Sequence, residues 1–321
     1  MSTTSSPRRI AIACQGGGSH TAFTAGALRG IFRNLPETYE IVGMSGTSGG
    51  AICALLAWSC LLRNDRDQAI ELLDAFWQDT SANFFYDMLL NNLVVLGSRL
   101  QDLVNLPAVN PYFYPPWGQE RLRLLLEKYV DFAQLPAYIT PTSPTFLVGA
   151  VNVLSGELTI FRDGEIDAEA ILASAAIPTL FRAVHTRGGV YWDGLFSHNP
   201  PIRDFMHTGT ATQPKPDEIW IIQINPSVRT EEPMTIQDIQ DRRNELAGNL
   251  SLNQEVYFIE RINELIASGV ISDTNYKHIT IRRLMMQRSL DYASKLDRSP
   301  SFIKDLIADG EERARAFLQA F

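Results

Sequence analysis

The sequence has few of the residues from which disulfides and metal sites are built. Its 321 residues include three cysteines and five histidines. Cys14, Cys53 and Cys60 are not spaced like metal ligands, and we expect them to be reduced thiols in the core. The sequence therefore predicts no metal site and no cofactor.

Charge and hydropathy argue against two further classes of protein. No long run of lysine or arginine is present, and the formal net charge is −8, so we expect no binding to nucleic acid and no electrostatic adhesion to anionic membranes. The longest apolar run, residues 51–62, is too short to cross a bilayer, and residues 1–9 lack the apolar segment of a secretory signal. We expect a cytoplasmic protein whose contact with membrane surfaces is transient, peripheral and mainly apolar.

The sequence does contain a large apolar fraction, 45%, arranged in alternating strand-like and helix-like segments. Strands are expected at 9–15, 39–45, 145–153, 157–162, 190–192, 218–225 and 278–282, and helices at 21–35, 51–62, 65–78, 119–129, 168–176, 236–266 and 299–321. Alternation through the first 230 residues predicts an α/β fold with a mostly parallel sheet. We expect one domain over residues 1–321, with a core at about 8–230 and a helical C-terminal extension at about 231–321.

Residues 84–117 do not fit this alternation. They mix apolar and aromatic residues with helix breakers and end in the sequence PYFYPPW. Our preferred interpretation is a buried irregular connection under the helices. A cap over a pocket or a membrane-touching lip is the alternative, because tryptophan and tyrosine suit an interface.

The most informative motif is the run of residues 46–50, GTSGG, which lies between an expected strand and an expected helix. A serine between glycines at such a turn holds its hydroxyl out on a sharp bend, where it can act as a nucleophile. The flanking Gly46, Gly49 and Gly50 allow strained backbone angles and leave room for an ester. A glycine-rich helix start capped by Ser48 is the competing interpretation.

Two other segments are expected at the same edge of the sheet. The triple glycine at 16–18 follows the first strand, and Asp193 ends a later strand just before Gly194. Ligands of open α/β sheets bind beyond the carboxyl ends of the strands. One pocket would then collect Ser48 as nucleophile, Asp193 as base and the free N–H groups of the glycine loop as oxyanion donors.

An aspartate base requires an unusual environment. The ordinary pKa of the group is about 3.9, and burial can raise it by up to about 3–5 units. We therefore expect Asp193 to be largely buried and close to Ser48. A dinucleotide or phosphate cradle is a poorer interpretation of the glycine loop, because Thr21 stands where the last glycine would be and no lysine follows.

Together these motifs resemble those of the patatin-like phospholipases. The matching segments are residues 15–18 with 25–26, residues 46–50, residues 173–178, and residues 193–194 with Asn199-Pro200 behind them. They fit the family across roughly residues 8–225. The resemblance implies a three-layer α/β/α fold with additional C-terminal helices, a lipid or acyl-ester substrate, and phospholipase A-like hydrolysis by a Ser48–Asp193 dyad without a histidine. It also implies an oxyanion loop made of Gly16, Gly17 and Gly18.

Two positions depart from the family pattern. Where the family usually has lysine or arginine and then glycine after the triple glycine, this chain has His20 and Thr21. A neutral imidazole carries no fixed charge, and a helix N-terminus discourages its protonation, so a positive charge at the site is in doubt. Leu195 stands where a small residue often follows, and it either narrows the pocket or packs.

Two alternative functions remain open from the sequence. The first is a triad esterase of the general α/β-hydrolase kind, with His198, His207 or His278 as the base, since these follow Asp193 in the order serine, acid, histidine. His185 is a further histidine candidate, but Ser48 comes early in the chain for that fold. The second is a protein that binds lipid without cleaving it.

Overall fold

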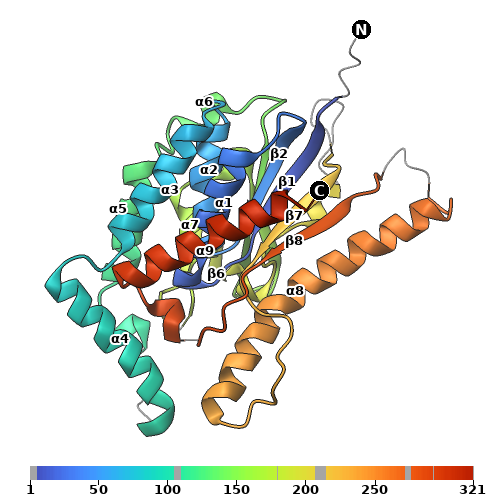
Figure 1. The fold of residues 1–321 in the computed structure, drawn as a ribbon. Helices are drawn as coiled ribbons and strands as arrows, with labels where there is room; N and C mark the ends of the chain where they lie inside the picture. Colours follow the sequence, from blue (N-terminus) through green and yellow to red (C-terminus); the bar gives the residue numbers. More distant parts are fainter. Residues whose placement is uncertain are drawn as a thin grey trace.

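The computed structural model describes residues 6–104, 110–178, 180–206, 215–271, 276–291 and 293–320. Within these residues one eight-stranded sheet has helices on both faces (Figure 1). The strands are β1 Arg8–Cys14, β2 Tyr39–Gly46, β3 Thr145–Asn152, β4 Leu158–Arg162, β5 Val184–Thr186, β6 Gly189–Asp193, β7 Glu218–Gln223 and β8 Thr280–Met285. The predicted three-layer α/β/α class is confirmed.

The helices account for most of the remaining described chain. The α-helices are α1 Ala22–Asn34, α2 Gly49–Leu61, α3 Arg66–Thr80, α4 Phe85–Val104, α5 Trp117–Tyr129, α6 Leu135–Tyr138, α7 Ala168–Ser174, α8 Ile236–Ala267 and α9 Pro300–Leu318. Short 3-10 helices are η1 Gly18–Thr21, η2 Pro111–Phe113, η3 Asp163–Glu165, η4 Gly194–Phe196, η5 Arg203–Met206 and η6 Ala293–Leu296. In the part of the chain that the structure describes, no helix is both long and apolar enough to cross a bilayer.

The sheet is parallel through its centre and antiparallel at one side. The strand order is β5-β6-β3-β2-β1-β7-β8, with β4 paired to β3 off this path. β3, β2, β1, β7 and β8 run parallel, whereas β4 and β6 run antiparallel to β3, and β5 antiparallel to β6. The C-terminal region thus contributes β8 to the same sheet that carries the N-terminal strands.

Alternating side chains of the central strands separate two hydrophobic clusters. In β1, Ile10, Ile12 and Cys14 face the helices α1, α2, α3 and α9, and Ala11 and Ala13 face α8. Such alternation follows from the two-residue repeat of a strand. Figure 1 shows the same division, with α8 on the opposite side of the strands from α1 and α9.

Helix α9 crosses α1 at very close range. A Cβ atom added at Gly26 would lie 1.9 Å from the carbonyl oxygen of Ile307, so only glycine allows this approach. Gly26, which belongs to one of the matching sequence segments, therefore has a packing role. It fixes the C-terminal helix against the helix that follows the glycine loop.

The structure differs from the prediction for residues 84–117. We expected a buried irregular connection, but α4 is a 20-residue helix. Most of its described apolar side chains are exposed, whereas Val95 is buried. The prediction was wrong because the helix-breaking prolines of this segment, at positions 107, 111, 115 and 116, all follow α4. Helix α4 itself contains no proline and a single glycine, Gly97. β5 is a further strand that was not predicted.

Candidate active site

Ser48 lies at the sharp turn between β2 and α2. Its backbone angles are φ 55° and ψ −131°, a left-handed conformation that a residue with a side chain rarely adopts. Gly46 ends β2, and Gly49 and Gly50 begin α2. The backbone N–H of Ser48 donates to Oγ of Ser174, 3.0 Å away at the end of α7. The turn therefore has the geometry of a nucleophile elbow.

The glycine loop passes directly over this turn. A Cβ atom at Gly16 would lie 2.6 Å from the carbonyl oxygen of Thr47 and 3.0 Å from Cβ of Ser48. Gly18 has φ +58°, which favours glycine, and it begins η1. Both positions need glycine, one because of space and the other because of backbone conformation.

One amide of the loop is not free, contrary to our expectation. The N–H of Gly16 donates to Oδ1 of Asn199 at 2.7 Å, and Asn199 in turn donates from Nδ2 to the carbonyl oxygen of Gly248 at 2.9 Å. The N–H groups of Gly17 and Gly18 have no acceptor among the described residues. Gly16 therefore anchors the loop, whereas the amides of Gly17 and Gly18 remain without an acceptor among the described residues.

Asp193 ends β6 and is buried, with 1% of its surface exposed. Its Oδ1 accepts the N–H of Leu195 at 2.8 Å, within the turn η4 that begins at Gly194. Burial raises the pKa of Asp193 to about 7, against the opposing effects of the Leu195 N–H, the Ser48 hydroxyl and the Lys295 charge. The carboxyl group is therefore able to exchange a proton near neutral pH.

The second oxygen of Asp193 faces the serine without a completed hydrogen bond. The Ser48 hydroxyl interacts with the carboxylate strongly enough to lower its pKa. Oδ2 nevertheless has no partner of full hydrogen-bond geometry among the described residues. The contact between the two side chains is thus loose in this state, and one carboxylate oxygen is available to accept a proton.

Ser48, Asp193 and the three glycines line one cavity with a volume of about 490 Å³. Most of its other walls are apolar and come from α2, α3, α4, α5, η6 and the segment after α7. The apolar residues include Ile52, Phe76, Trp77, Val94, Leu122, Ile177, Leu180, Phe181 and Leu296. Such a cavity suits an acyl chain. Asp193 contributes to its wall with only 1% of the residue's surface exposed.

Strand direction explains how Asp193 reaches this cavity. The sequence predicts a mostly parallel sheet, but β6 runs antiparallel to β3, with Asp193 opposite Ala150. In β3, Val148 pairs with Gly46 at the end of β2, two residues away from Ala150. β6 has only five residues, so it ends while it is still beside the carboxyl end of β3. Asp193 therefore lies near the carboxyl end of β2 as well.

His20 is buried and neutral. Its Nε2 and Oγ of Ser294 are 2.7 Å apart. Burial, with the nearby charges of Lys295 and Arg288, lowers the pKa of His20 to about 3, although Asp291 opposes the shift. Position 20 therefore brings no positive charge to the site, and burial is the main cause, rather than the helix N-terminus that we invoked.

The histidines proposed for a triad lie elsewhere. Nδ1 of His198 pairs with Oε1 of Glu255, whose Oε2 accepts the N–H groups of Ile202 and Arg203. His185 lies in β5, and His278 lies beside β8 in a different surface pocket. His207 is outside the described residues. No described histidine lines the cavity of Ser48, so the triad alternative has no support from the geometry.

Three residues at the site were not predicted as site residues. Asn199 and Ser174 lie within the matching segments, and these motifs were the signal that could have found them. Lys295 lines the cavity from η6, about 100 residues beyond Asp193 in the sequence. No local pattern around Lys295 indicates this position, because only the packing of the C-terminal region brings it there.

A comparison with protein-family models now identifies the class. The chain matches the model described as patatin-like phospholipase over residues 12–206. This match covers more than half of the chain, which therefore belongs to the patatin-like phospholipase family. The protein is accordingly a lipid acyl hydrolase in the broad sense, as the motifs predicted. No curated protein matches the sequence.

Solved structures that resemble this one include the following two. VipD from Legionella pneumophila matches with a TM-score of 0.45 and 13% identity, over 98% of this chain and 67% of VipD. A chain of the heterodimeric ExoU–SpcU complex from the type III secretion system of Pseudomonas aeruginosa matches with a TM-score of 0.39 and 15% identity. That match covers 98% of this chain, which spans about half, 52%, of the other.

Proposed function

We propose that this protein hydrolyses fatty-acyl ester bonds of lipids with Ser48 as nucleophile and Asp193 as general base. One observation carries the proposal: a strained serine and a buried carboxylate with a free oxygen line the same apolar cavity. The raised pKa of Asp193 supports its role, because a base is most effective when its pKa is near the working pH.

The proposed reaction has two steps. Asp193 accepts the Ser48 proton while Oγ attacks the ester carbonyl carbon, and the carbonyl oxygen becomes an oxyanion that the N–H groups of Gly17 and Gly18 bind. The intermediate then expels the alcohol, which takes the proton from Asp193. In the second step a water molecule gives a proton to Asp193 and attacks the carbonyl carbon of the acyl-Ser48 ester. The resulting intermediate expels Oγ of Ser48, which takes this proton back from Asp193, and the fatty acid is released.

The first test is covalent labelling of Ser48 by a fluorophosphonate. We expect labelling of the folded protein at Ser48, with a rate that rises with pH through a midpoint near 7 as Asp193 loses its proton. Mass spectrometry of the labelled peptide gives the site, and short esters, neutral glycerides and phospholipids show which esters are cleaved. Absence of label at Ser48, with lipid binding retained, would instead favour a non-catalytic lipid-binding protein.

We also propose one domain over residues 1–321 and a transient apolar contact with membranes through α4. β8 extends the sheet of the core, which supports a single domain.

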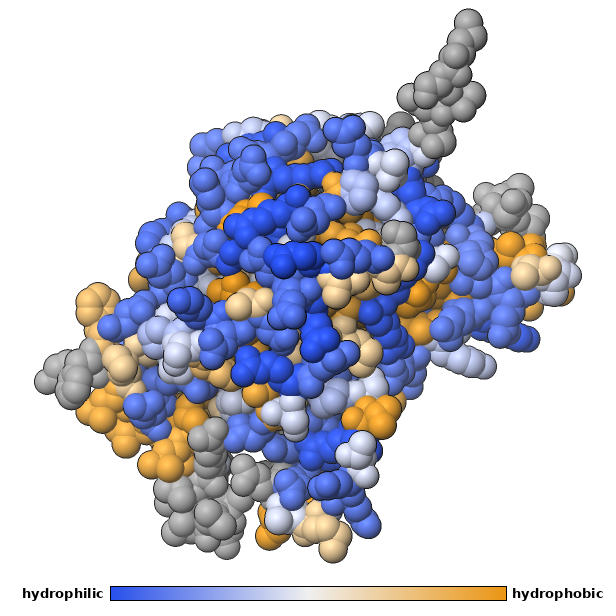
Figure 2. Space-filling model, viewed as in Figure 1, coloured by the Kyte–Doolittle hydropathy of each residue, from blue (hydrophilic) through white to orange (hydrophobic). Residues whose placement is uncertain are grey.

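On α4 the exposed apolar residues gather on one part of the surface, where Figure 2 shows hydrophobic side chains at the lower left. These residues are Met88, Leu89, Leu90, Leu93, Val94 and Leu96. Val94 also lines the cavity, so this surface borders the proposed acyl site.

Replacing Leu89, Leu93 and Leu96 together by glutamine should weaken binding to phosphatidylcholine vesicles by about 100-fold. The reason is that burial of each leucine in the membrane interface contributes on the order of 1 kcal/mol to the binding free energy. Hydrolysis of a water-soluble short ester should not change. Leu154→Gln, in the exposed turn between β3 and β4, is the matched control. Unchanged vesicle flotation of the triple variant would contradict the proposal.

A further inference from the structure

The glycine loop is covered by a residue from the far end of the chain. Lys295 belongs to η6, outside residues 12–206 that match the family model. A Cβ atom at Gly18 would lie 2.4 Å from the carbonyl oxygen of Lys295, and one at Gly17 would lie 4.0 Å from its Cε. Both the backbone and the side chain of Lys295 therefore pack against the two glycines whose amides remain free.

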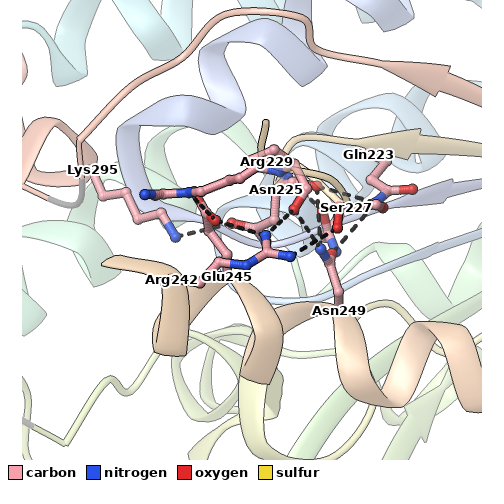
Figure 3. A network of polar contacts seen from close by, with 10 residues as sticks. Gln223, Asn225, Ser227, Arg229, Arg242, Glu245, Asn249 and Lys295 are labelled. Carbon is pink, nitrogen blue, oxygen red and sulfur yellow. Dashed lines mark hydrogen bonds and ion pairs between the residues drawn. The ribbon is translucent and has the colours of Figure 1, made fainter. Parts of the chain in front are cut away.

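The ammonium group is held next to the loop. Nζ of Lys295 donates to Oδ1 of Asn225 at 3.0 Å, and the Asn225 N–H donates to Oε1 of Gln15 at 2.9 Å. Gln15 is the residue just before the triple glycine. Figure 3 shows Lys295 reaching toward Asn225 and Glu245 across this network. Lys295 also lines the cavity that holds Ser48 and Asp193.

Acidic and basic groups both lie around Lys295. The charged or titratable groups that act on Lys295 or share its small neighbouring pocket are Asp193, Asp241, Glu245, Arg288 and His20. Glu245 is already paired with Arg229 at 2.7 Å and with Arg242 at 3.1 Å. Two other cations line the cavity, but Arg298 pairs with Asp87 and Arg182 donates to backbone carbonyls.

We propose that Lys295 supplies the positive charge at the glycine loop that His20 does not. In this role it stabilises the Asp193 carboxylate and the negative charge that develops on the ester oxygen. The inference rests on the proposed function. Lys295 acts through the loop and through Asp193, so it is a positioning residue. The coupling is visible in both groups: Lys295 lowers the pKa of Asp193, and Asp193 raises that of Lys295.

The test compares Lys295→Met with Lys295→Arg, which keeps the charge. On an uncharged short ester, we expect kcat of the methionine variant to fall about 10- to 100-fold, less than the loss for a direct oxyanion donor. The acid limb of its pH profile should move up by about 1 pH unit, because an opposite charge no longer favours the Asp193 carboxylate. Lys304→Met, at an exposed position of α9, is the control and should behave like the native protein.

The arginine variant gives an independent measurement that does not depend on the folding of the methionine variant. Burial lowers the pKa of Lys295 to about 8, against the effects of Glu245, Asp241 and Asp193, so native activity should fall again above pH 8. Guanidinium stays charged, and Lys295→Arg should lose this alkaline limb. An unchanged alkaline limb in this variant would overturn the inference.

Two other results would also overturn it. One is a methionine variant with native kcat and native acid limb. The other is a loss confined to phospholipids with neutral esters unaffected, since that result would assign Lys295 to binding of the headgroup phosphate. Failure of the underlying proposal is distinguishable, because the native protein itself would then show no fluorophosphonate label at Ser48.

Discussion

Replacing Ser48 by glycine is expected to abolish ester hydrolysis and, at the same time, to stabilise the fold. The loss of turnover should reach about 10⁴-fold or more, because the hydroxyl is the proposed nucleophile. The gain in the free energy of unfolding should be about 1 kcal/mol. Backbone strain from a side chain held at φ 55° costs on the order of 1–3 kcal/mol, and glycine removes this strain. The greater flexibility of glycine in the unfolded chain offsets part of the gain.

Ser48→Ala is the matched comparison for this result. It removes the hydroxyl but keeps Cβ, so it should be equally inactive without the gain in stability. Initial rates on a short ester and thermal unfolding of the three proteins provide the measurement. A glycine variant that is less stable than the alanine variant would show that the turn at Ser48 is not strained, and residual turnover in either would assign the chemistry elsewhere.

Replacing Asp193 by asparagine should nearly abolish turnover, because the variant lacks the proposed base that accepts the serine proton. The same substitution should make the protein more stable than the native form at alkaline pH. The raised pKa means that folding disfavours the charged carboxylate. The contribution of protonated Asp193 to the free energy of unfolding is therefore fully present below about pH 4, the ordinary pKa of an aspartate. This contribution is lost as the pH rises through about 7, the pKa in the folded protein.

The stability difference between Asp193→Asn and the native protein should grow between pH 4 and pH 7 and then level off. From the pKa of about 7 it should approach the order of 4 kcal/mol at pH 8 and above. Denaturant unfolding at a series of pH values measures it, with Asp305→Asn at an exposed position of α9 as the control. A difference independent of pH would contradict the buried charge, and an active variant would refute the base.

The folding pattern of the core could be predicted because its signals are local. The apolar run of β1 ends in a glycine loop, and a similar run in β2 ends in the serine motif. Each motif therefore marks the end of an element. The antiparallel direction of β6 could not be predicted, since a five-residue strand ending in Asp193 has the same sequence pattern in either direction.

The sequence by itself determined that this chain has a serine on a glycine-flanked turn, a triple glycine after its first strand and an aspartate after a later one. Tertiary structure alone decided what these groups meet. Asn199 accepts a hydrogen bond from the N–H of Gly16, the cavity that Asp193 lines has mostly apolar walls, and Lys295 packs against the glycine loop. The physical reason is the distance along the sequence over which each property is set. Backbone conformation depends on neighbouring residues, whereas burial, the local electrostatic environment and the number of free hydrogen-bond donors depend on contacts between distant parts of the chain.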